Sequence, residues 1–371
     1  SSRRRHTRFK CDWSSDVCSS DLSLRGAIEA ELSDFISFEN QNLIDVDIEL
    51  SPVAAALSQY LLQGGKRIRP IFALVGYLGT GATLNSSVIK AAASLELLQA
   101  CALIHDDLID GSDNRRGMLS IHKNFEKYHL TNHRAGNATN FGVAAAVLLG
   151  DLALVWSDKC INDSKISTEA RLLLNPIHDS MRIEIMAGQY LDVLEQTMTN
   201  TSVERALKIA RFKSGKYTIE RPLHFGAALA VPKNFNTLIS IYSEYGLPLG
   251  EAFQLRDDLL GVFGDPTETG KPAGDDLREG KRTALIAYTY DRSDSGNQKV
   301  LDSLLGKADL NLAEIENLRE IIIDSGAKTH VEDLIEKLAE EALEAIERNE
   351  ISTEAKTLLV ELVAIATKRS K

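Results

Sequence analysis

The chain has 371 residues, of which 44% are hydrophobic and 6% aromatic, and its formal net charge is −11. The length supports one large core or two ordinary domains. The shortage of aromatic residues and prolines favours helices. The negative net charge argues against a general nucleic-acid-binding protein. The four cysteines lack metal-site spacing and no uninterrupted apolar run reaches the length of a membrane span, so we expect a reduced, cytoplasmic protein.

The first 22 residues differ from the rest of the chain. Residues 1–6 are mostly basic without a helical period, and residues 14–22 contain the near-repeat SSDV and SSDL. This stretch lacks the apolar centre of a secretory signal. We therefore expect 1–22 to be a non-native or disordered leader, and 23–371 to form one folded domain.

The first helices lead to a basic loop. Apolar residues recur at three- and four-residue intervals from about Leu24, which predicts a helix, and Pro52 can start a second one. The second helix ends in GGKRIRP at 64–70, where glycines allow close backbone approach and cations follow. The loop could simply be exposed to solvent, but the glycines before it and the helix that restarts at Pro70 favour a loop that binds an anion. The residues that we place in this site are Gly65, Lys66 and Arg69.

The next predicted helix, residues 87–110, is apolar on nearly every side, as is typical of a buried central helix. It ends in Asp106, Asp107 and Asp110, whose spacing lets all three share one face. Like charges this close repel, so a hard divalent cation is their natural partner. A solvated acidic helix end is the alternative. Two cations, Arg115 and Arg116, follow in a polar turn.

Three helical stretches are expected before the second acidic stretch. The first covers 142–156 with an interruption at Gly150, and the second begins at Pro176. The third, RFKSGKY at 211–217, has serine and glycine inserted, which lets a ligand approach or kinks the helix. Residues 118–140 are expected to form a looser connection.

The second acidic stretch, residues 253–265, is another apolar helix that opens into paired carboxylates, Asp257 and Asp258. The glycine-rich loop that follows carries Lys271 and Lys281, and we expect it to close over a phosphate-bearing ligand. From residue 285 onward the pattern is helical. Since no strand run of convincing length separates the helices, the predicted fold is all-α, a single large bundle around a central cavity.

These patterns indicate a diphosphate site. If the two aspartate clusters face each other, their carboxylates can hold several Mg²⁺ ions together with substrate phosphate oxygens. The apolar helices beneath suit a hydrocarbon tail, so an allylic diphosphate could ionise in a water-excluding cavity. The surrounding cations exceed what one carboxylate substrate needs and suit diphosphates; they are Lys66, Arg69, Arg115, Arg116, Lys213, Lys271 and Lys281.

The chain resembles the trans-isoprenyl diphosphate synthases of the polyprenyl synthetase family, and is similar to bacterial geranylgeranyl diphosphate synthases. The similarity runs from about residue 45 to 300. It implies an isoprenoid synthase type I fold, a Mg²⁺-dependent prenyltransferase with about three ions per site, and a homodimer. The motifs that carry it are GGKRIRP (64–70), HDDLID and RRG (105–117), GQYLD (188–192), FKSG (212–215), FQLRDD (253–258) and GKPAGDDLREGKRT (270–283).

The resemblance also implies residue roles. Asp106, Asp107 and Asp110 would bind the ions that hold the allylic diphosphate, while Asp257 would bind a third ion with Asp258 close by. The residues implied to contact the allylic substrate or its diphosphate are Arg115, Lys213, Ser214, Gln254, Lys271 and Lys281. Those implied to hold isopentenyl diphosphate are Gly65, Lys66, Arg69, Gln99 and Arg116.

Two positions depart from the family pattern. Gln99 stands where the family usually has histidine, and glutamine still donates a hydrogen bond. Gly261 stands where the second motif normally carries a third aspartate. The sequence leaves two outcomes open. Either the third metal site is weaker, or Asp265 takes the place of the third aspartate and contacts the metal ion through a water molecule.

Product length depends on the residues below the first aspartate cluster. The fifth and fourth residues before Asp106 are Cys101 and Ala102, both small. In this family an aromatic residue there blocks the product tunnel, so its absence predicts a longer product, for which we expect C20 geranylgeranyl diphosphate. Leu97 and Leu98, one turn deeper, are the expected floor.

Three other functions compete with this prediction. A longer-chain polyprenyl diphosphate synthase would share every motif. A class I terpene cyclase would use similar chemistry but would not need a second diphosphate site, so GGKRIRP argues against it. A non-catalytic partner subunit would tend to lose its first aspartates, and all three are present here.

Overall fold

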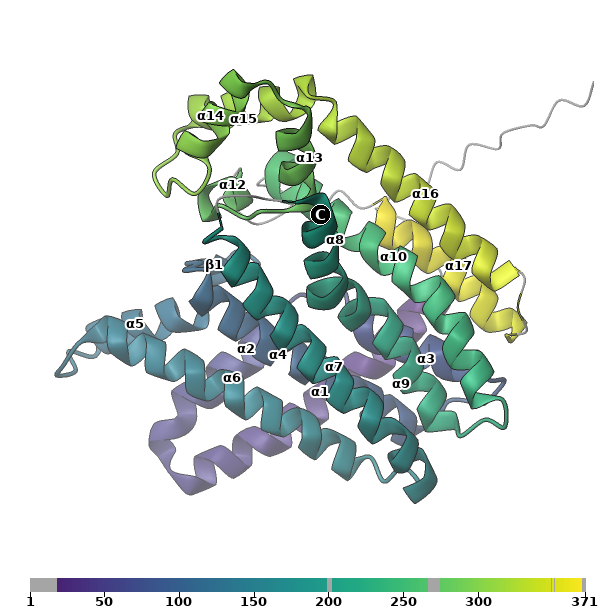
Figure 1. Ribbon diagram of the computed structural model, residues 1–371. Coiled ribbons are helices and arrows are strands. Elements are labelled where there is room, and N and C mark those ends of the chain that lie inside the picture. The colour runs from purple at the N-terminus through teal and green to yellow at the C-terminus, as the bar shows by residue number, and fades with distance from the viewer. Residues whose placement is uncertain (1–18, 199–201, 266–273, 348, 350, 369–371) are drawn as a thin grey trace, which may run out of the picture.

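The computed structural model describes residues 19–198, 202–265, 274–347, 349 and 351–368. The predicted all-α fold is confirmed (Figure 1). The helices up to the first aspartate cluster are α1 (Ser19–Val46), η1 (Ile48–Leu50), α2 (Ser51–Leu62), α3 (Ile68–Leu78) and α4 (Ser86–Ile109). The next are α5 (Ile121–Thr131), α6 (Ala138–Asp163), α7 (Thr168–Glu195), α8 (Val203–Ala210), η2 (Arg211–Glu220), α9 (Arg221–Ala230) and α10 (Phe235–Phe263). The last are α12 (Asp275–Glu279), α13 (Ala284–Arg292), α14 (Ser295–Leu304), α15 (Leu312–Asp324), α16 (Ala327–Glu347) and α17 (Thr353–Thr367).

The central helix α4 forms because its sequence has no glycine or proline and begins with a strong cap. The side chain of Asn85 accepts a hydrogen bond from the backbone N–H of Val88. The helix packs along α6 and beside α1 and α3, and most of its apolar residues are buried, although Ile109 at its C-terminal end is 51% exposed. Gly150 of α6 makes the approach close, because an added Cβ there would lie 2.1 Å from the His105 ring. This packing fixes where the carboxylates at the end of α4 point.

Several predicted boundaries differ from the structure. α6 runs unbroken through Gly150, and α7 contains Pro176 in its interior because Ser167 caps the helix earlier in the chain. Residues 121–131 form α5 instead of a loose connection. Helix α1 begins at Ser19, so the last four residues of the predicted leader are helical; residues 1–18 lie outside the described part.

A short hairpin is the one feature of the described residues that an all-helical prediction missed. β1 (Asn114–Arg115) pairs antiparallel with β2 (Met118–Leu119). The turn between them has positive φ at Arg116 (53°) and Gly117 (75°), the conformation that two-residue hairpins need. The hairpin folds the chain back directly after the first aspartate cluster.

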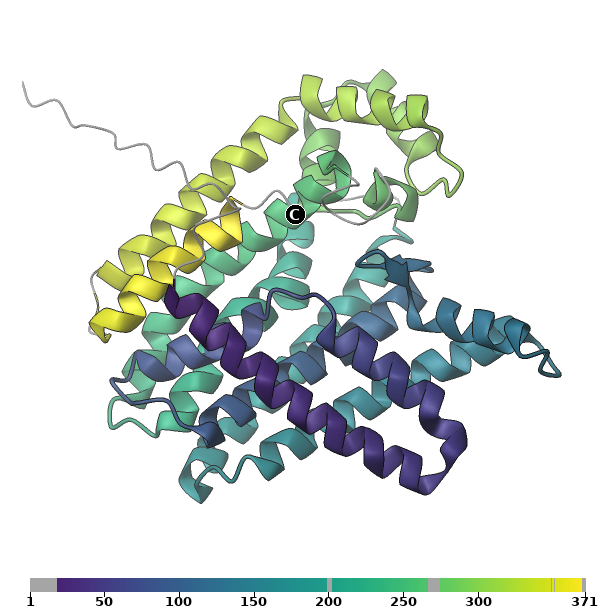
Figure 2. The same cartoon turned by 180° about the vertical axis from the view of Figure 1, so that it is seen from behind.

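The buried apolar side chains form two clusters that meet in α10. The larger surrounds α4 and includes Phe253, and the smaller joins the C-terminal end of α10, including Leu255 and Leu259, to α12–α16. Figure 1 shows α12–α15 gathered above that end of α10, with α16 and α17 lying along it. Figure 2 shows α1 crossing the opposite side of the molecule beside α2. The single helix α10 therefore links both cores.

Two described helices, α4 and α6, are long and apolar enough to cross a membrane by length and composition alone. Neither is an uninterrupted apolar run, because α4 contains Lys90 and Glu96 and α6 contains Asp151. The apolar stretch of α4 is 67% buried, as for a core helix of a soluble protein, whereas that of α6 is 28% buried. Helix α6 thus presents an apolar face to the outside.

Candidate active site

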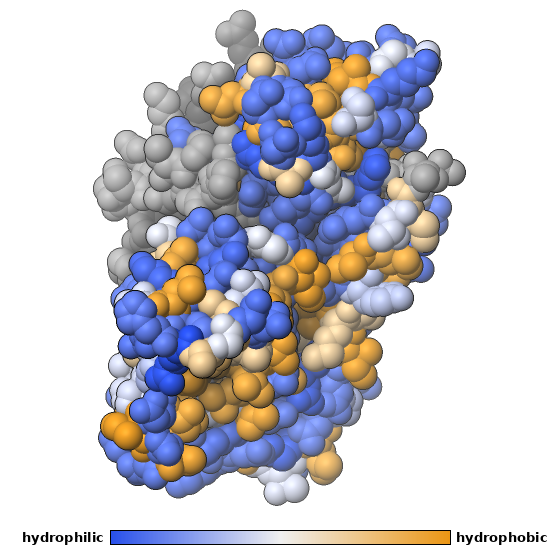
Figure 3. All heavy atoms as spheres, turned by 90° about the vertical axis from the view of Figure 1, so that its left-hand side faces the viewer, coloured by the Kyte–Doolittle hydropathy of each residue, from blue (hydrophilic) through white to orange (hydrophobic). Residues whose placement is uncertain are grey.

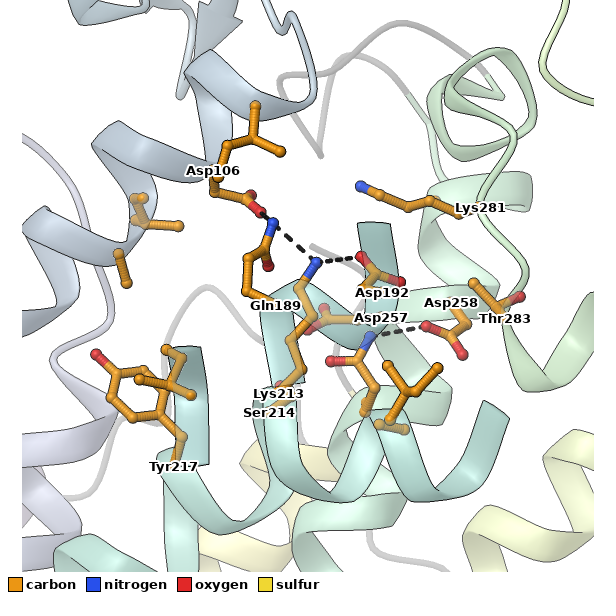
Figure 4. A pocket seen from close by; sticks show the side chains of 18 of the residues that line it. Asp106, Gln189, Asp192, Lys213, Ser214, Tyr217, Asp257, Asp258, Lys281 and Thr283 are labelled. Atoms are coloured by element: carbon orange, nitrogen blue, oxygen red, sulfur yellow. Dashed lines mark hydrogen bonds and ion pairs between the residues drawn. The ribbon is translucent and has the colours of Figure 1, made fainter. Parts of the chain in front are cut away.

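A cavity of 790 Å³ lies among α4, α7, η2, α10 and α12. Of the two aspartate clusters, Asp106 of the first and both Asp257 and Asp258 of the second line it, as do Lys213 of η2 and Lys281 after α12 (Figure 4). One end of the cavity is charged and the other is apolar. The apolar part of its lining includes Leu98, Cys101, Ala102, Ile185 and Ile209.

Adjacent aspartates of the first cluster have different surroundings. Asp106 faces the cavity, where it accepts a hydrogen bond of 2.9 Å from Gln189 Nε2. Asp107 is fully buried and accepts a 2.7 Å hydrogen bond from Arg115 Nε. Burial of the Arg115 guanidinium favours its neutral form, yet the charges of Asp107 and Asp106 outweigh burial and raise its pKa. The Asp107 carboxylate holds Arg115 in place, and its predicted role as a metal ligand stays a prediction.

The second predicted cation, Lys213, projects from a π-helix. η2 is wound with one residue more per turn than an α-helix, a feature often found at functional sites. Lys213 Nζ lies 2.6 Å from Asp192 and 3.5 Å from Asp106 (Figure 4). Gly188 allows η2 to approach α7, because an added Cβ would lie 2.4 Å from the backbone N of Lys213. Ser214, the next residue, also lines the cavity.

Lys281 joins the loop after α12 to the first cluster. Its Nζ lies 3.2 Å from Asp110, 2.5 Å from Glu279 and 3.6 Å from Asp276. Burial raises the pKa of Asp110, and Asp106 and Glu279 raise it further, while Lys281 opposes them. Ser112 Oγ also donates to Glu279 at 3.0 Å. Lys281 therefore ties the end of this loop to the first cluster; Lys271 lies outside the described residues, and closure of the loop over a ligand stays a prediction.

The second cluster faces the first across the cavity. Asp257 and Asp258 line it, and Gln254 Nε2 donates a 2.7 Å hydrogen bond to Asp258. Burial raises the pKa of Asp258 to about 8, and the nearby carboxylates of Asp276 and Asp257 contribute. Within the described part of the chain no three ligand groups converge on one point. This oxygen-rich set fits a hard cation that takes its remaining ligands from substrate phosphates.

The residues predicted for a second anion site lie in the loop before α3, in the first turn of α3, on α4 and in the hairpin. An added Cβ at Gly65 would lie 3.3 Å from the Arg116 guanidinium, which shows how closely the two segments meet. Arg69 and Gln99 line the cavity itself, and Gln99 Oε1 is buried without a hydrogen-bond partner among the described residues. Lys66 lies in the same loop but outside the cavity lining.

Arg67, between Lys66 and the start of α3, has a different place from its basic neighbours. Its backbone is left-handed (φ 54°) and its side chain is buried, with a 2.8 Å ion pair to Glu96. Glu96 is one of the polar members of the apolar helix α4, so this pair neutralises two buried charges. Arg67 therefore anchors the loop, and Arg69 is the arginine of this segment that lines the cavity.

The structure adds four residues to the site that the sequence prediction left without a role. Two of them, Gln189 and Asp192, lie three apart on α7, and this spacing could have revealed their shared face. Tyr217 lies four residues after Lys213; its hydroxyl is buried without a hydrogen-bond partner in the described structure, and its ring lies 4.4 Å from the Arg69 guanidinium. No sequence signal marks the fourth, Asp276, because its neighbours come from α10.

The predicted chain-length residues are placed at the apolar end. Cys101, Ala102 and Leu98 line the cavity. Leu97, expected to share the floor with Leu98, is fully buried and is absent from the lining, because it points to the other side of α4. Ile185 and Met186 of α7 form the facing wall.

Comparison with known proteins gives concordant matches. The polyprenyl synthetase family pattern matches residues 51–322. A structure of geranylgeranyl pyrophosphate synthase from Corynebacterium glutamicum, complexed with isoprenyl diphosphate and magnesium, superposes with a TM-score of 0.89 at 40% identity, covering 94% of this chain and 99% of that one. Geranylfarnesyl diphosphate synthase from Aeropyrum pernix is 30% identical, covering 93% of this chain and 99% of its own. A (2E,6E)-farnesyl diphosphate synthase from Mycobacterium bovis is 30% identical, and the match covers 69% of this chain and 66% of that protein.

Proposed function

Since the chain belongs to the polyprenyl synthetase family, we propose that it condenses isopentenyl diphosphate head-to-tail with an allylic diphosphate, which can be dimethylallyl, geranyl or farnesyl diphosphate. The product is a trans-polyprenyl diphosphate. The observation that carries this proposal is the cavity itself: two carboxylate clusters face each other at one end, and the other end is apolar.

At the charged end, the chain's own residues bind and orient the allylic diphosphate. Lys213 and Arg115 supply positive charge beside Asp106, and Lys281 supplies it beside Asp110. Asp106, Asp110 and Asp257 would hold Mg²⁺. When bound, Mg²⁺ neutralises charge on the departing diphosphate. Gln254 and Ser214 line the same region. Lys271 belongs to this group by resemblance and lies outside the described residues. We infer that Asp258 and Asp107 support the ligands next to them.

At the second anion site, isopentenyl diphosphate is held by Gly65, Lys66, Arg69, Gln99 and Arg116. Arg69 and Gln99 line the cavity next to this site. From there the double bond of isopentenyl diphosphate can reach the allylic carbon in surroundings that exclude water. The allylic C–O bond breaks and releases diphosphate, the double bond of isopentenyl diphosphate forms the new C–C bond to the allylic carbon, and the released diphosphate takes the proton that the isopentenyl unit then loses. No side chain is needed as the base.

We propose C20 geranylgeranyl diphosphate as the product. Cys101 and Ala102 are small and line the apolar end, so the cavity is not closed by an aromatic ring there. The similar proteins differ in the length named for their products, from farnesyl to geranylfarnesyl. A longer polyprenyl diphosphate is the alternative, which Leu98 and Met186 at the cavity wall would have to accommodate.

We also propose a homodimer in the cytoplasm. Large apolar side chains are exposed along α6 and α7, and Figure 3 shows apolar residues gathered across the lower part of the side that carries α6. Such a face is larger than the scattered apolar residues of a monomer surface. The buried free thiols of Cys101 and Cys160 fit a reducing compartment.

The test is incubation of the protein with Mg²⁺, isopentenyl diphosphate and each of the three allylic diphosphates, followed by dephosphorylation and chromatography of the products. We expect geranylgeraniol as the main alcohol. Longer alcohols would identify a longer-chain synthase. Cyclised hydrocarbon without isopentenyl incorporation would indicate a terpene cyclase, and no product with any substrate would indicate a non-catalytic subunit; either result contradicts the proposal.

A further inference from the structure

The second aspartate motif of this chain ends in glycine, and a carboxylate from elsewhere occupies the space beside it. We propose that Asp276 replaces the missing third carboxylate of this motif, in the space that Gly261 leaves open, and acts toward the metal ion held by Asp257. The inference rests on the proposed function and deepens it, because it assigns a positioning residue to the metal end of the same cavity.

The first line of evidence is steric. Gly261 lies four residues after Asp257 and three after Asp258 on α10, so a side chain at 261 would share the face of both aspartates. A Cβ added at Gly261 would lie 1.9 Å from Asp276 Oδ2 and 2.4 Å from its Cγ. The carboxylate of Asp276 therefore occupies the place where the third side chain of the motif would begin. With Asp276 in this position, residue 261 has no room for a side chain.

The second line of evidence is the shared cavity. Asp257, Asp258, Gly261 and Asp276 all line it. The charge of Asp276 is close enough to Asp258 to be the largest single carboxylate influence on its pKa. Asp276 thus belongs electrostatically to the second cluster, although it lies on α12.

The third line of evidence concerns the alternative, Asp265. Asp265 is exposed on the surface and is absent from the cavity lining, whereas the Asp276 side chain is only 14% exposed. Asp276 is also 3.6 Å from Lys281, whose Nζ reaches Asp110 of the first cluster. Of the two outcomes that the sequence leaves open, a weaker third metal site or substitution by Asp265, we adopt neither and assign the role to Asp276.

The arrangement predicts that positions 261 and 276 are interchangeable as the source of the carboxylate. A Gly261→Asp change alone would place two carboxylates in one space, with overlap and like-charge repulsion. A Gly261→Asp change combined with Asp276→Gly would move the carboxylate back to α10. We therefore expect each single change to be harmful and the pair to be compensating.

The experiment measures Mg²⁺ binding by calorimetry in the presence of inorganic diphosphate, for the full chain and four variants. We expect Asp276→Asn, which keeps the size and removes the charge, to weaken Mg²⁺ binding about 10- to 100-fold, as for other groups that support metal ligands. Gly261→Asp should weaken it as well, and the double variant G261D/D276G should restore it. Asp309→Asn, which removes one highly exposed charge far from the cavity, is the matched control and should change nothing.

Unchanged Mg²⁺ affinity in Asp276→Asn would overturn the inference. So would a folded double variant, judged by its circular dichroism and melting, that binds Mg²⁺ no better than Asp276→Asn. If the double variant does not fold, Asp276→Asn decides alone. Product formation by the unaltered protein tests the proposed function separately from the role of Asp276. If Mg²⁺ binding depends on Asp276 but no product forms, the proposed function is contradicted and the role of Asp276 is supported.

Discussion

At the residue scale, the chemistry depends on neighbours that are far apart in the chain. Helical spacing places Asp106, Asp107 and Asp110 on one face, but it cannot say which of them points into a cavity. The hairpin decides this, because it folds Arg115 back onto Asp107 and leaves Asp106 for Gln189 and Lys213. The candidate carboxylates could thus be predicted from the sequence, whereas their separate environments could not.

A substitution at the apolar end tests the product-length proposal. Cys101→Phe places a ring in the cavity four to five residues below the aspartates, so we expect a shorter main product. The measurement is chromatography of the dephosphorylated products, with Cys101→Ala as the matched control, which should leave the length unchanged or increased. The same product length in the phenylalanine variant would show that Cys101 is not part of the tunnel floor.

Protonation of a buried histidine is expected to limit stability in acid. His224 Nε2 lies 3.1 Å from the carbonyl oxygen of Ile239, to which it can donate, and Nδ1 can accept from Arg221. Burial lowers the pKa of His224 from 6.5 to about 3, and the charge of Arg221 adds to this. Below about pH 6.5 the unfolded chain therefore binds a proton that the folded chain does not, so the stability present above pH 6.5 is lost as the pH falls.

The expected loss from His224 between pH 8 and pH 5 is roughly 2 kcal/mol in the free energy of unfolding. Urea unfolding of the native chain and of His224→Gln at both pH values measures it. The variant should lose less stability than the native chain over this interval, whatever its stability at pH 8. An equal loss in both proteins would show that His224 does not control the acid response.

At the element scale, close helix contacts at glycines set the position of the π-helix η2. Gly188 of α7 faces the backbone of Lys213, and Gly250 of α10 faces Gly215, where an added Cβ would lie 2.6 Å from the Gly215 Cα. The sequence marks 211–217 as unusual through its inserted serine and glycine, but it gives no sign of a π-helix, because that winding depends on the helices packed on both sides. The prediction for α4 differs from the structure by one residue at each end, whereas the start of α7 was predicted eight residues too late because the cap at Ser167 was not identified.

Gly188→Ala tests whether this packing positions Lys213. The added methyl group would press on the Lys213 backbone, so we expect a loss of stability of about 1–3 kcal/mol, typical of overpacking, together with a lower kcat. The matched control is Gly26→Ala on α1, where nothing lies within 4 Å and alanine should stabilise by about 0.5–1 kcal/mol. Thermal unfolding and steady-state rates measure both. A Gly188→Ala variant with native stability and rate would contradict the positioning role.

At the scale of the whole molecule, the main feature is an apolar face on α6 and α7 that is exposed in the single chain. Leu148 and Val155 lie seven residues apart on α6, and Ile183, Met186 and Tyr190 are spaced by three and four on α7, so each helix carries a continuous stripe. Met186 and Tyr190 also line the cavity. The proposed dimer would therefore cover a surface that borders the site.

Charge placed in this face should separate the subunits. Leu148 is 65% exposed, so Leu148→Glu costs the isolated chain little, but it would bury a charge in a dimer interface. We expect the native chain to have twice the mass of one chain by light scattering, and the variant to have the mass of one chain. Ile323→Glu, at an exposed apolar residue of α15, is the control and should not change the mass. A monomeric native chain would contradict the proposed homodimer.

The central claim is that both aspartate clusters act together on one allylic diphosphate while isopentenyl diphosphate attacks. The most direct measurement is incorporation of radiolabelled isopentenyl diphosphate into an acid-labile prenyl product, with farnesyl diphosphate and Mg²⁺, by the native chain, Asp106→Asn and Asp257→Asn. We predict incorporation by the native chain, and a rate at least about 100-fold lower in each variant, because each removes charge stabilisation of the leaving group. Incorporation at the native rate by either variant, or none by the native chain, would contradict the account.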